Sequence, residues 1–243
     1  MAVAAGLWGM DALIRRPLAK STQAATIVLG EHVLLVLVFL PVIAVALPAL
    51  WRAGPRYVAA GVVIGAGSSA LATILFTQAF VEGDPVTPVV LQKVQPLVAV
   101  SLAAAALWAL GTVLGRFLAL ELPFQQVTAV RFAFGLPASL LAVLVLGAPL
   151  TASLHDQAFI FLLAIVTGFV ALLLYYYGLQ RTTASVASVA ELTFPVVAIA
   201  VGYLALDGAM TSTGARLGSS KTTRLVSATP ATCVLVIVPS RAR

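Results

Sequence analysis

The sequence predicts an all-α membrane protein, a polytopic bundle of about seven or eight transmembrane helices. Composition carries this prediction, because 61% of the 243 residues are hydrophobic and only 9% are charged, whereas a soluble domain has about 25% charged residues. The apolar runs are continuous rather than alternating with polar residues, which excludes a transmembrane barrel. A helix satisfies its backbone hydrogen bonds within one segment, so helices are the expected spanning elements.

The apolar runs divide the chain into seven expected helices, at residues 2–18, 24–51, 57–80, 86–116, 124–146, 158–179 and 183–206. The run from Val94 to Leu114 contains no charged residue. It is either one long helix or two spans whose connection is missing. Residues 210–243 are polar and basic, and their apolar run at 231–238 is too short to cross a membrane. We therefore expect this tail to be poorly ordered.

The charged and reactive residues argue against several classes of function. The net charge of +6 comes from basic residues at span ends and in the tail, where positive charge orients membrane proteins, so no nucleic-acid partner is expected. The one cysteine, Cys233, excludes an intramolecular disulfide and a cysteine-rich metal site. The sequence has no nucleophile–base pair, zinc-ligand spacing or phosphate-binding glycine motif. We expect neither an enzyme nor a cofactor or metal, and the first apolar run shows no cleavage pattern of a separate signal peptide.

An internal repeat with a spacing of about one hundred residues runs through the chain. Pro96 aligns with Pro195, and Gln92 then aligns with Glu191. A similar offset matches Leu7 with Leu107, Trp8 with Trp108 and Arg16 with Arg116. Internal repeats of transporters place the substrate site near the middle of the membrane, between the halves, at interrupted helices. We expect two repeats at 1–100 and 101–209, with helix breaks at Pro96 and Pro195.

Three motifs in the second repeat resemble those of an EamA-type transporter of the drug/metabolite transporter superfamily. They are Ala-Leu-Trp-Ala-Leu-Gly-Thr-Val-Leu-Gly-Arg at 106–116, Thr-Ala-Val-Arg-Phe at 128–132, and Ala-Ser-Val-Ala-Glu-Leu-Thr-Phe-Pro-Val-Val-Ala at 187–198. The resemblance extends over about residues 1–207. It implies two inverted repeats of five helices, alternating access, and export or uptake of small metabolites, amino-acid-like or other small organic solutes. It also implies a multi-pass protein of the bacterial inner membrane.

The chain departs from that family plan in two places. The fifth span of the first repeat is missing, which favours a join near Val100 and Ser101, and the tail at 211–243 replaces the tenth span. Loss of one crossing would make the two halves parallel rather than inverted. Alternatively, the long run stays one helix and a different segment adjusts.

Glu191 is the sharpest candidate for the substrate pathway. It lies inside an apolar span, one helical turn before Pro195, whose missing amide frees a carbonyl. A charge at mid-bilayer costs roughly 2.5–3.5 kcal/mol, so such residues face a cavity or a partner. Glu191 therefore binds substrate or a proton, unless it lies at the membrane interface near a helix start.

Further polar residues in the spans complete the expected pathway: Gln92, Lys93, Gln95, Arg131, Glu31 and His32. Lys93 either neutralises Glu191, binds a substrate carboxylate or extends its amine to the headgroups. Arg131 keeps its charge and needs a carboxylate or an anionic ligand, and Glu31 is one candidate partner. His32 either relays protons or is an ordinary helix-end histidine. Asp11 likewise either takes part in the pathway or is an ordinary structural residue. The aromatic residues Trp8, Trp108 and Tyr175 to Tyr177 could line the pathway but are expected mainly to pack against other side chains.

The function expected from these residues is solute transport, with membrane lipids as partners and proton coupling resting on Glu191; a homodimer is left open. The alternative is a non-transporting protein, either a defective fragment of such a transporter or a membrane scaffold. A seven-helix retinal protein is set aside, because it needs a lysine deep in a late span and Lys221 lies in a polar stretch.

Overall fold

The computed structural model describes residues 1–82, 97–201 and 204, and this part of the chain forms seven helical stretches without a strand. In chain order they are α1 (Ala2–Gly9) with α2 (Asp11–Ser21); α3 (Ala24–Ala53); α4 (Pro55–Val62), the π-helical η1 (Val63–Leu71) and α5 (Ala72–Glu82); α7 (Leu97–Leu118); α8 (Phe124–Leu146); α9 (Leu154–Leu163), the π-helical η3 (Ala164–Val170) and α10 (Ala171–Leu179); and α11 (Ala184–Glu191) with α12 (Thr193–Val201). Gln92, Lys93, Gln95 and Pro96 lie outside the described residues, as does the tail at 210–243.

Four helices of the described part are long and apolar enough to cross a membrane: Ala24–Ala53, Pro55–Ala79, Phe124–Leu146 and Leu154–Leu179. Two shorter apolar helices, Leu102–Leu118 and Val189–Val201, accompany them. Large apolar side chains such as Leu37, Val45, Leu141 and Val145 are exposed on α3 and α8, as lipid contact requires. The prediction of an all-helical, multi-pass membrane protein is therefore confirmed. The expected first span is divided, because the chain turns at Met10 between α1 and α2.

Short connections place consecutive helices side by side. Gly54 joins α3 to α4 as one residue with φ of 115°, and Gly147 ends α8 in the left-handed region with φ of 61°. Both values favour glycine, because a Cβ disfavours positive φ. Ser153 Oγ accepts a hydrogen bond of 3.1 Å from the backbone N–H of Asp156 and so caps the N-terminus of α9.

Helix α3 packs against α8, which also packs against η1, and α1 packs against α12. Aromatic side chains fill the space beside α3. The ring of Phe39 stacks on that of Phe132 at 5.9 Å and lies 5.3 Å from that of Phe169. All three elements, α3, α8 and η3, thus share one apolar core.

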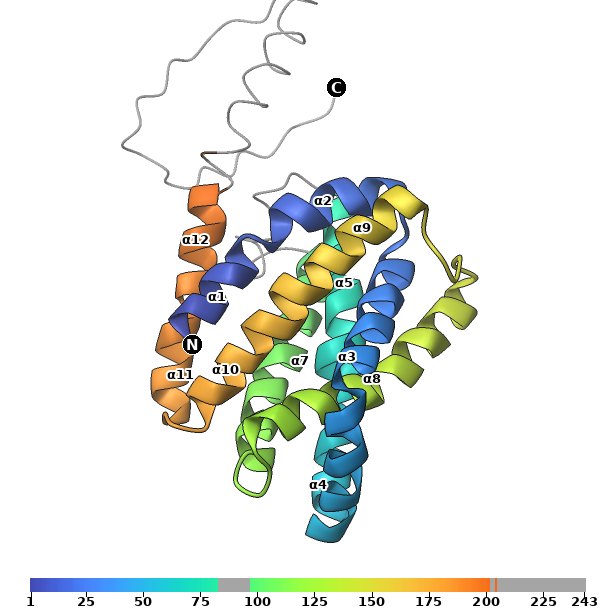
Figure 1. The fold of residues 1–243 in the computed structure, drawn as a ribbon. Helices are drawn as coiled ribbons and strands as arrows, with labels where there is room; N and C mark the ends of the chain where they lie inside the picture. Colours follow the sequence, from blue (N-terminus) through green and yellow to red (C-terminus); the bar gives the residue numbers. More distant parts are fainter. Residues whose placement is uncertain (83–96, 202–203, 205–243) are drawn as a thin grey trace, which may run out of the picture. The chain divides into compact units, whose positions relative to one another are not determined.

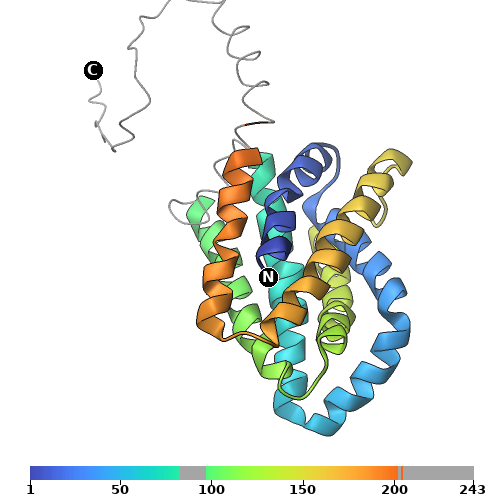
Figure 2. The same cartoon turned by 60° about the vertical axis from the view of Figure 1, so that its left-hand side comes forward.

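The two sets of helices run in opposite directions (Figures 1 and 2). In both views α7, α8 and α9–α10 run opposite to α1–α2, α3 and α4–α5, respectively. The parallel arrangement expected after loss of one crossing is wrong for these helices. Three helical stretches precede α7 among the described residues, and α7 starts from the end of the bundle at which α1–α2 finishes. From Leu97 onward α7 is one helix, and it continues through Val100 and Ser101 without interruption.

Candidate functional site

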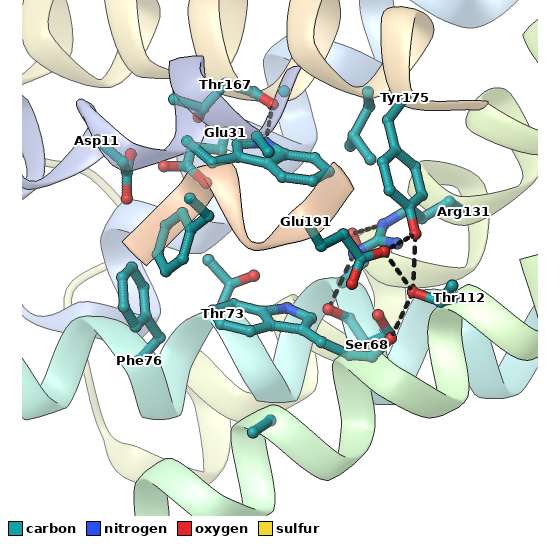
Figure 3. A pocket seen from close by; sticks show the side chains of 18 of the residues that line it. Asp11, Glu31, Ser68, Thr73, Phe76, Thr112, Arg131, Thr167, Tyr175 and Glu191 are labelled. Carbon is teal, nitrogen blue, oxygen red and sulfur yellow. Dashed lines mark hydrogen bonds between the residues drawn. The ribbon is translucent and has the colours of Figure 1, made fainter. Parts of the chain in front are cut away.

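A cavity of about 560 Å³ lies inside the bundle, and side chains from all seven helical stretches line it. Small-molecule sites are of this size, about 300–1,000 Å³. Its wall is largely apolar and aromatic, with five charged side chains: Asp11, Arg15, Glu31, Arg131 and Glu191. Figure 3 shows Asp11 and Glu31 toward one side of this cavity, and Ser68, Thr112, Arg131, Tyr175 and Glu191 toward the other.

Arg15 holds two carboxylates together at the first side. Its Nε donates to Asp11 Oδ2 at 2.5 Å, and its Nη2 donates to Glu31 Oε1 at 2.9 Å. Its Nη1 donates to Thr77 Oγ1 at 2.9 Å. The pair at positions 11 and 15 is one helical turn apart on α2, and Glu31 comes from α3. This group, the Arg15 cluster (Asp11, Arg15, Glu31 and Thr77), contains two acids for one guanidinium.

Arg131 lies at the other side and contacts only neutral acceptors. Its Nε donates to Ser69 Oγ at 3.2 Å, its Nη2 to the carbonyl of Ser68 at 3.0 Å, and its Nη1 to the hydroxyl of Tyr176 at 3.3 Å. In the described part of the chain, no carboxylate lies within 4.0 Å of this guanidinium. Arg131 is 9% exposed, so its charge is buried without a counter-ion, which is costly unless a ligand supplies one.

The tautomer of His32 follows from the same network. Its Nδ1 lies 2.7 Å from the carbonyl of Val28, so Nδ1 carries the proton and donates. Its Nε2, 3.1 Å from Ser69 Oγ, then accepts the hydroxyl proton of Ser69. The Ser69 hydroxyl oxygen also accepts a hydrogen bond from Arg131. In this chain of hydrogen bonds Arg131 donates to Ser69, and Ser69 donates to His32. In this tautomer His32 positions the hydroxyl of Ser69 for its contact with Arg131.

Glu191, at the end of α11, lies toward the same side of the cavity as Arg131 (Figure 3). Its Oε1 accepts from the hydroxyl of Tyr175 at 2.6 Å and from Thr112 Oγ1 at 3.4 Å. Helix α11 ends at Glu191, and α12 begins at Thr193 after a one-residue break at Leu192. Pro195 explains this break, because its ring displaces the carbonyl four residues earlier, that of Glu191.

Two aromatic pairs form walls of the cavity. The rings of Trp8 and Tyr175 lie 5.1 Å apart, and those of Phe76 and Trp108 lie 5.2 Å apart. Trp8 is oriented by its Nε1, which donates to the carbonyl of Thr167 at 3.0 Å. These two aromatic pairs therefore give the cavity apolar surface in addition to its charged groups.

Both π-helical segments contribute to the cavity, which Ser68 and Ser69 line from η1 and Thr167 and Gly168 line from η3. A π-helix widens the helical turn and often marks a functional site. Glycines allow close approach here. A Cβ on Gly135 would collide with His32 Nε2, and one on Gly111 would lie 2.6 Å from the Cβ of Ser68.

Four of the residues expected in the substrate pathway, Glu31, His32, Arg131 and Glu191, line this one cavity, as does Pro195. Glu31 does not pair with Arg131; it pairs with Arg15 because α2 turns its basic residue inward. Trp8, Trp108 and Tyr175 pack in aromatic pairs, as expected, and all three also line the cavity.

Sequence reasoning missed several residues of the site: Arg15, Ser68, Ser69, Thr77 and Thr112. Arg15 was missed because it lies next to Arg16 and near Lys20, and such a basic segment is typical of a loop at the end of a membrane span. The spacing of Asp11 and Arg15 was the available signal, because acid and base four residues apart within an apolar segment face one another. The neutral hydroxyl residues carried no such signal.

Apolar helices around a cavity that holds buried charges define the class of membrane protein to which transporters of polar solutes belong. The sequence profile of the EamA-like transporter family matches residues 99–220, half of the chain, and the chain belongs to this family. The match includes α7 to α12, which supply Thr112, Arg131 and Glu191. Searches of curated proteins and of solved structures found no match to this chain.

Proposed function

We propose that this protein carries a small organic solute across the bacterial inner membrane by alternating access, with the central cavity as the solute site. The observation that carries the proposal is the gathering of five charged side chains from four separate helices, α2, α3, α8 and α11, around one cavity. Placing charges in the interior of apolar helices is costly, so they are expected only where they meet a partner or a polar cargo. Membership in a transporter family supports the same function.

The proposed mechanism uses two inverted halves, residues 1–100 and 101–209. Their helices begin at matching positions: α3 at 24 and α8 at 124, α4 at 55 and α9 at 154. Corresponding helices run in opposite directions, and each half has one π-helical segment in its third stretch. Movement of one half against the other about the cavity would then open it to alternate sides. Gln92, Lys93 and Gln95 remain predicted members of the pathway.

Solute flux into liposomes containing the purified protein tests this function. The panel of labelled solutes consists of amino acids, amines, organic acids, sugars and nucleosides. We expect flux of at least one of them above that of protein-free liposomes, and loss of this flux in Arg131→Gln. Arg52→Gln is the matched control, because Arg52 is exposed at the end of α3 and donates only to the carbonyl of Pro48.

Flux equal to that of protein-free liposomes across the whole panel would support the alternative, a non-transporting fragment or scaffold. The departure from the family plan of ten spans favours that alternative, since the described part of the chain has seven helical stretches. Equal losses in Arg131→Gln and Arg52→Gln would also contradict the assignment of the cavity as the solute site.

A further inference from the structure

Two residues that line the cavity each have a buried polar atom without a hydrogen-bond partner in the described part of the chain. They are Asp11 Oδ1 and Ser68 Oγ. Asp11 is 5% exposed and Ser68 is 2% exposed, so both side chains are buried. A carboxylate oxygen accepts a hydrogen bond, whereas a hydroxyl also donates one. A rotation of each side chain would therefore offer an acceptor at one side of the cavity and a donor at the other (Figure 3).

The donor side has the chemistry of a carboxylate site. Ser68 Oγ lies beside the guanidinium of Arg131, which contacts the carbonyl of the same serine. Arg131 has no carboxylate within 4.0 Å among the described residues. A guanidinium with a neighbouring hydroxyl donor binds a carboxylate through charge-assisted hydrogen bonds.

The two acidic positions have the chemistry of ammonium sites. In the Arg15 cluster two carboxylates share one guanidinium, so the cluster has an excess negative charge when its groups are ionised. Glu191, toward the same side of the cavity as Arg131 (Figure 3), accepts from two neutral hydroxyls and has no cation within 4.0 Å among the described residues. Buried carboxylates of this kind are stabilised by a cationic group.

The charges of the whole cavity favour an occupant with one net positive charge. Three carboxylates and two guanidiniums line it, which leaves one negative charge when all are ionised. The matching solute has one carboxylate and two ammonium groups. The aromatic pairs Trp8–Tyr175 and Phe76–Trp108 provide apolar surface for a methylene chain between them.

We infer that the solute of this site is a diamino carboxylate such as lysine or ornithine. Its carboxylate binds Arg131 and Ser68, its α-amine binds Glu191, and its terminal amine binds Asp11 at the Arg15 cluster. This inference rests on the proposed function, whose solute it names, but it concerns binding and is tested without transport.

Calorimetric titration of the purified protein with four probes tests each contact separately. Lysine has all three groups, norleucine lacks the terminal amine, cadaverine lacks the carboxylate and 6-aminohexanoate lacks the α-amine. We expect lysine to bind about tenfold to a hundredfold more tightly than each of the other three, the range for lost hydrogen bonds to charged groups. This comparison uses only the wild-type chain. Equal affinity for norleucine and lysine, or no binding of lysine, overturns the inference.

The variant Asp11→Asn tests whether Asp11 binds the terminal amine. It should weaken the binding of lysine and cadaverine by about tenfold or more and leave the affinity for norleucine unchanged, because only lysine and cadaverine have the amine that Asp11 binds. Asp156→Asn, the same substitution at the start of α9, should leave all four affinities unchanged, since Asp156 is not among the cavity-lining residues. An equal loss for lysine and norleucine in Asp11→Asn overturns the assignment.

The titration tests the identity of the solute and the flux assay tests transport, so one hypothesis can be wrong while the other holds. Flux of another solute without lysine binding would retain the proposed function and overturn this inference. Lysine binding with the expected preference, but without flux of any solute, would retain the inference and overturn the transport function.

Discussion

At the scale of single residues, the cavity separates two roles for its charged groups. Arg15 is fully engaged by Asp11, Glu31 and Thr77, so it holds α2 to α3 and α5. Arg131 and Glu191 instead contact neutral groups, so neither has a charged partner among the described residues. The two arginines are both buried, so their different roles follow from their hydrogen-bond partners.

Glu191→Gln tests proton coupling. The amide keeps the shape of the carboxylate but cannot take up a proton, so we expect the dependence of flux on a pH gradient to be lost. Flux should be measured at matched and opposed pH across the liposome membrane. Other groups of the cavity that titrate or carry charge, and so bear on the profile, are Asp11, Arg15, Glu31, His32, Arg131 and Tyr175.

The control for this substitution is Glu121→Gln, in the exposed turn between α7 and α8, where Glu121 accepts from the hydroxyl of Tyr57 at 3.1 Å. It should retain the wild-type response to pH. If Glu191→Gln left both transport and its pH dependence unchanged, Glu191 would not be the coupling group.

The charged members of the site could be predicted from the sequence better than the neutral ones. Glu191, Arg131 and Glu31 stand out, because a charge in an apolar span is costly and therefore needs a cavity or partner. Ser68 and Thr112 do not, because a hydroxyl in an apolar span can bond a carbonyl of its own helix, as Thr112 Oγ1 does with Trp108 at 3.2 Å, and so does not require a cavity. Their place at the cavity depends on how the helices pack, which the local sequence does not specify.

At the scale of elements, α7 approaches η1 closely at Gly111. A Cβ there would lie 2.6 Å from the Cβ of Ser68 and 3.9 Å from Nη1 of Arg131. We expect Gly111→Ala to force the two helices apart and to lower the free energy of unfolding by about 1–3 kcal/mol, the range for overpacked sites. Thermal unfolding in detergent is the measurement.

Gly6→Ala is the matched control for that substitution, because the nearest atom to its Cβ would be Val197 Cγ2 at an ordinary 3.8 Å. It should unfold at the wild-type temperature or slightly above, since alanine favours a helix over glycine. Equal destabilisation by both substitutions would show that contact with Ser68 is not the cause.

The positions of the helices could be predicted from the sequence better than the places where helices are interrupted. The break before Pro195 could be anticipated, because proline removes a donor and displaces a carbonyl. The π-helical segments η1 and η3 could not, because their residues are ordinary apolar and small ones with no marker of a wider turn. The turn at Met10 was also missed, since the stretch 2–18 reads as one apolar run.

At the scale of the whole molecule, the opposite directions of the two helix sets underlie the account. The sequence predicts membrane helices because composition alone forces lipid contact. It does not fix their relative direction, which depends on how many crossings precede α7. In the inverted arrangement α7, α8 and α11 bring Thr112, Arg131 and Glu191 to the same cavity that α1, α2 and α3 line.

The most direct test is the side of the membrane on which each exposed loop lies. Single cysteines would be placed in a Cys233→Ser background and labelled with a membrane-impermeant reagent from each side. The positions are exposed ones at the ends of helical stretches: Lys20, Arg56, Glu121 and Thr151. The account predicts that Lys20 and Thr151 are labelled from one side, and Arg56 and Glu121 from the other. Labelling of Glu121 with Lys20, and of Thr151 with Arg56, would make the two sets parallel and contradict the cavity as a transport site.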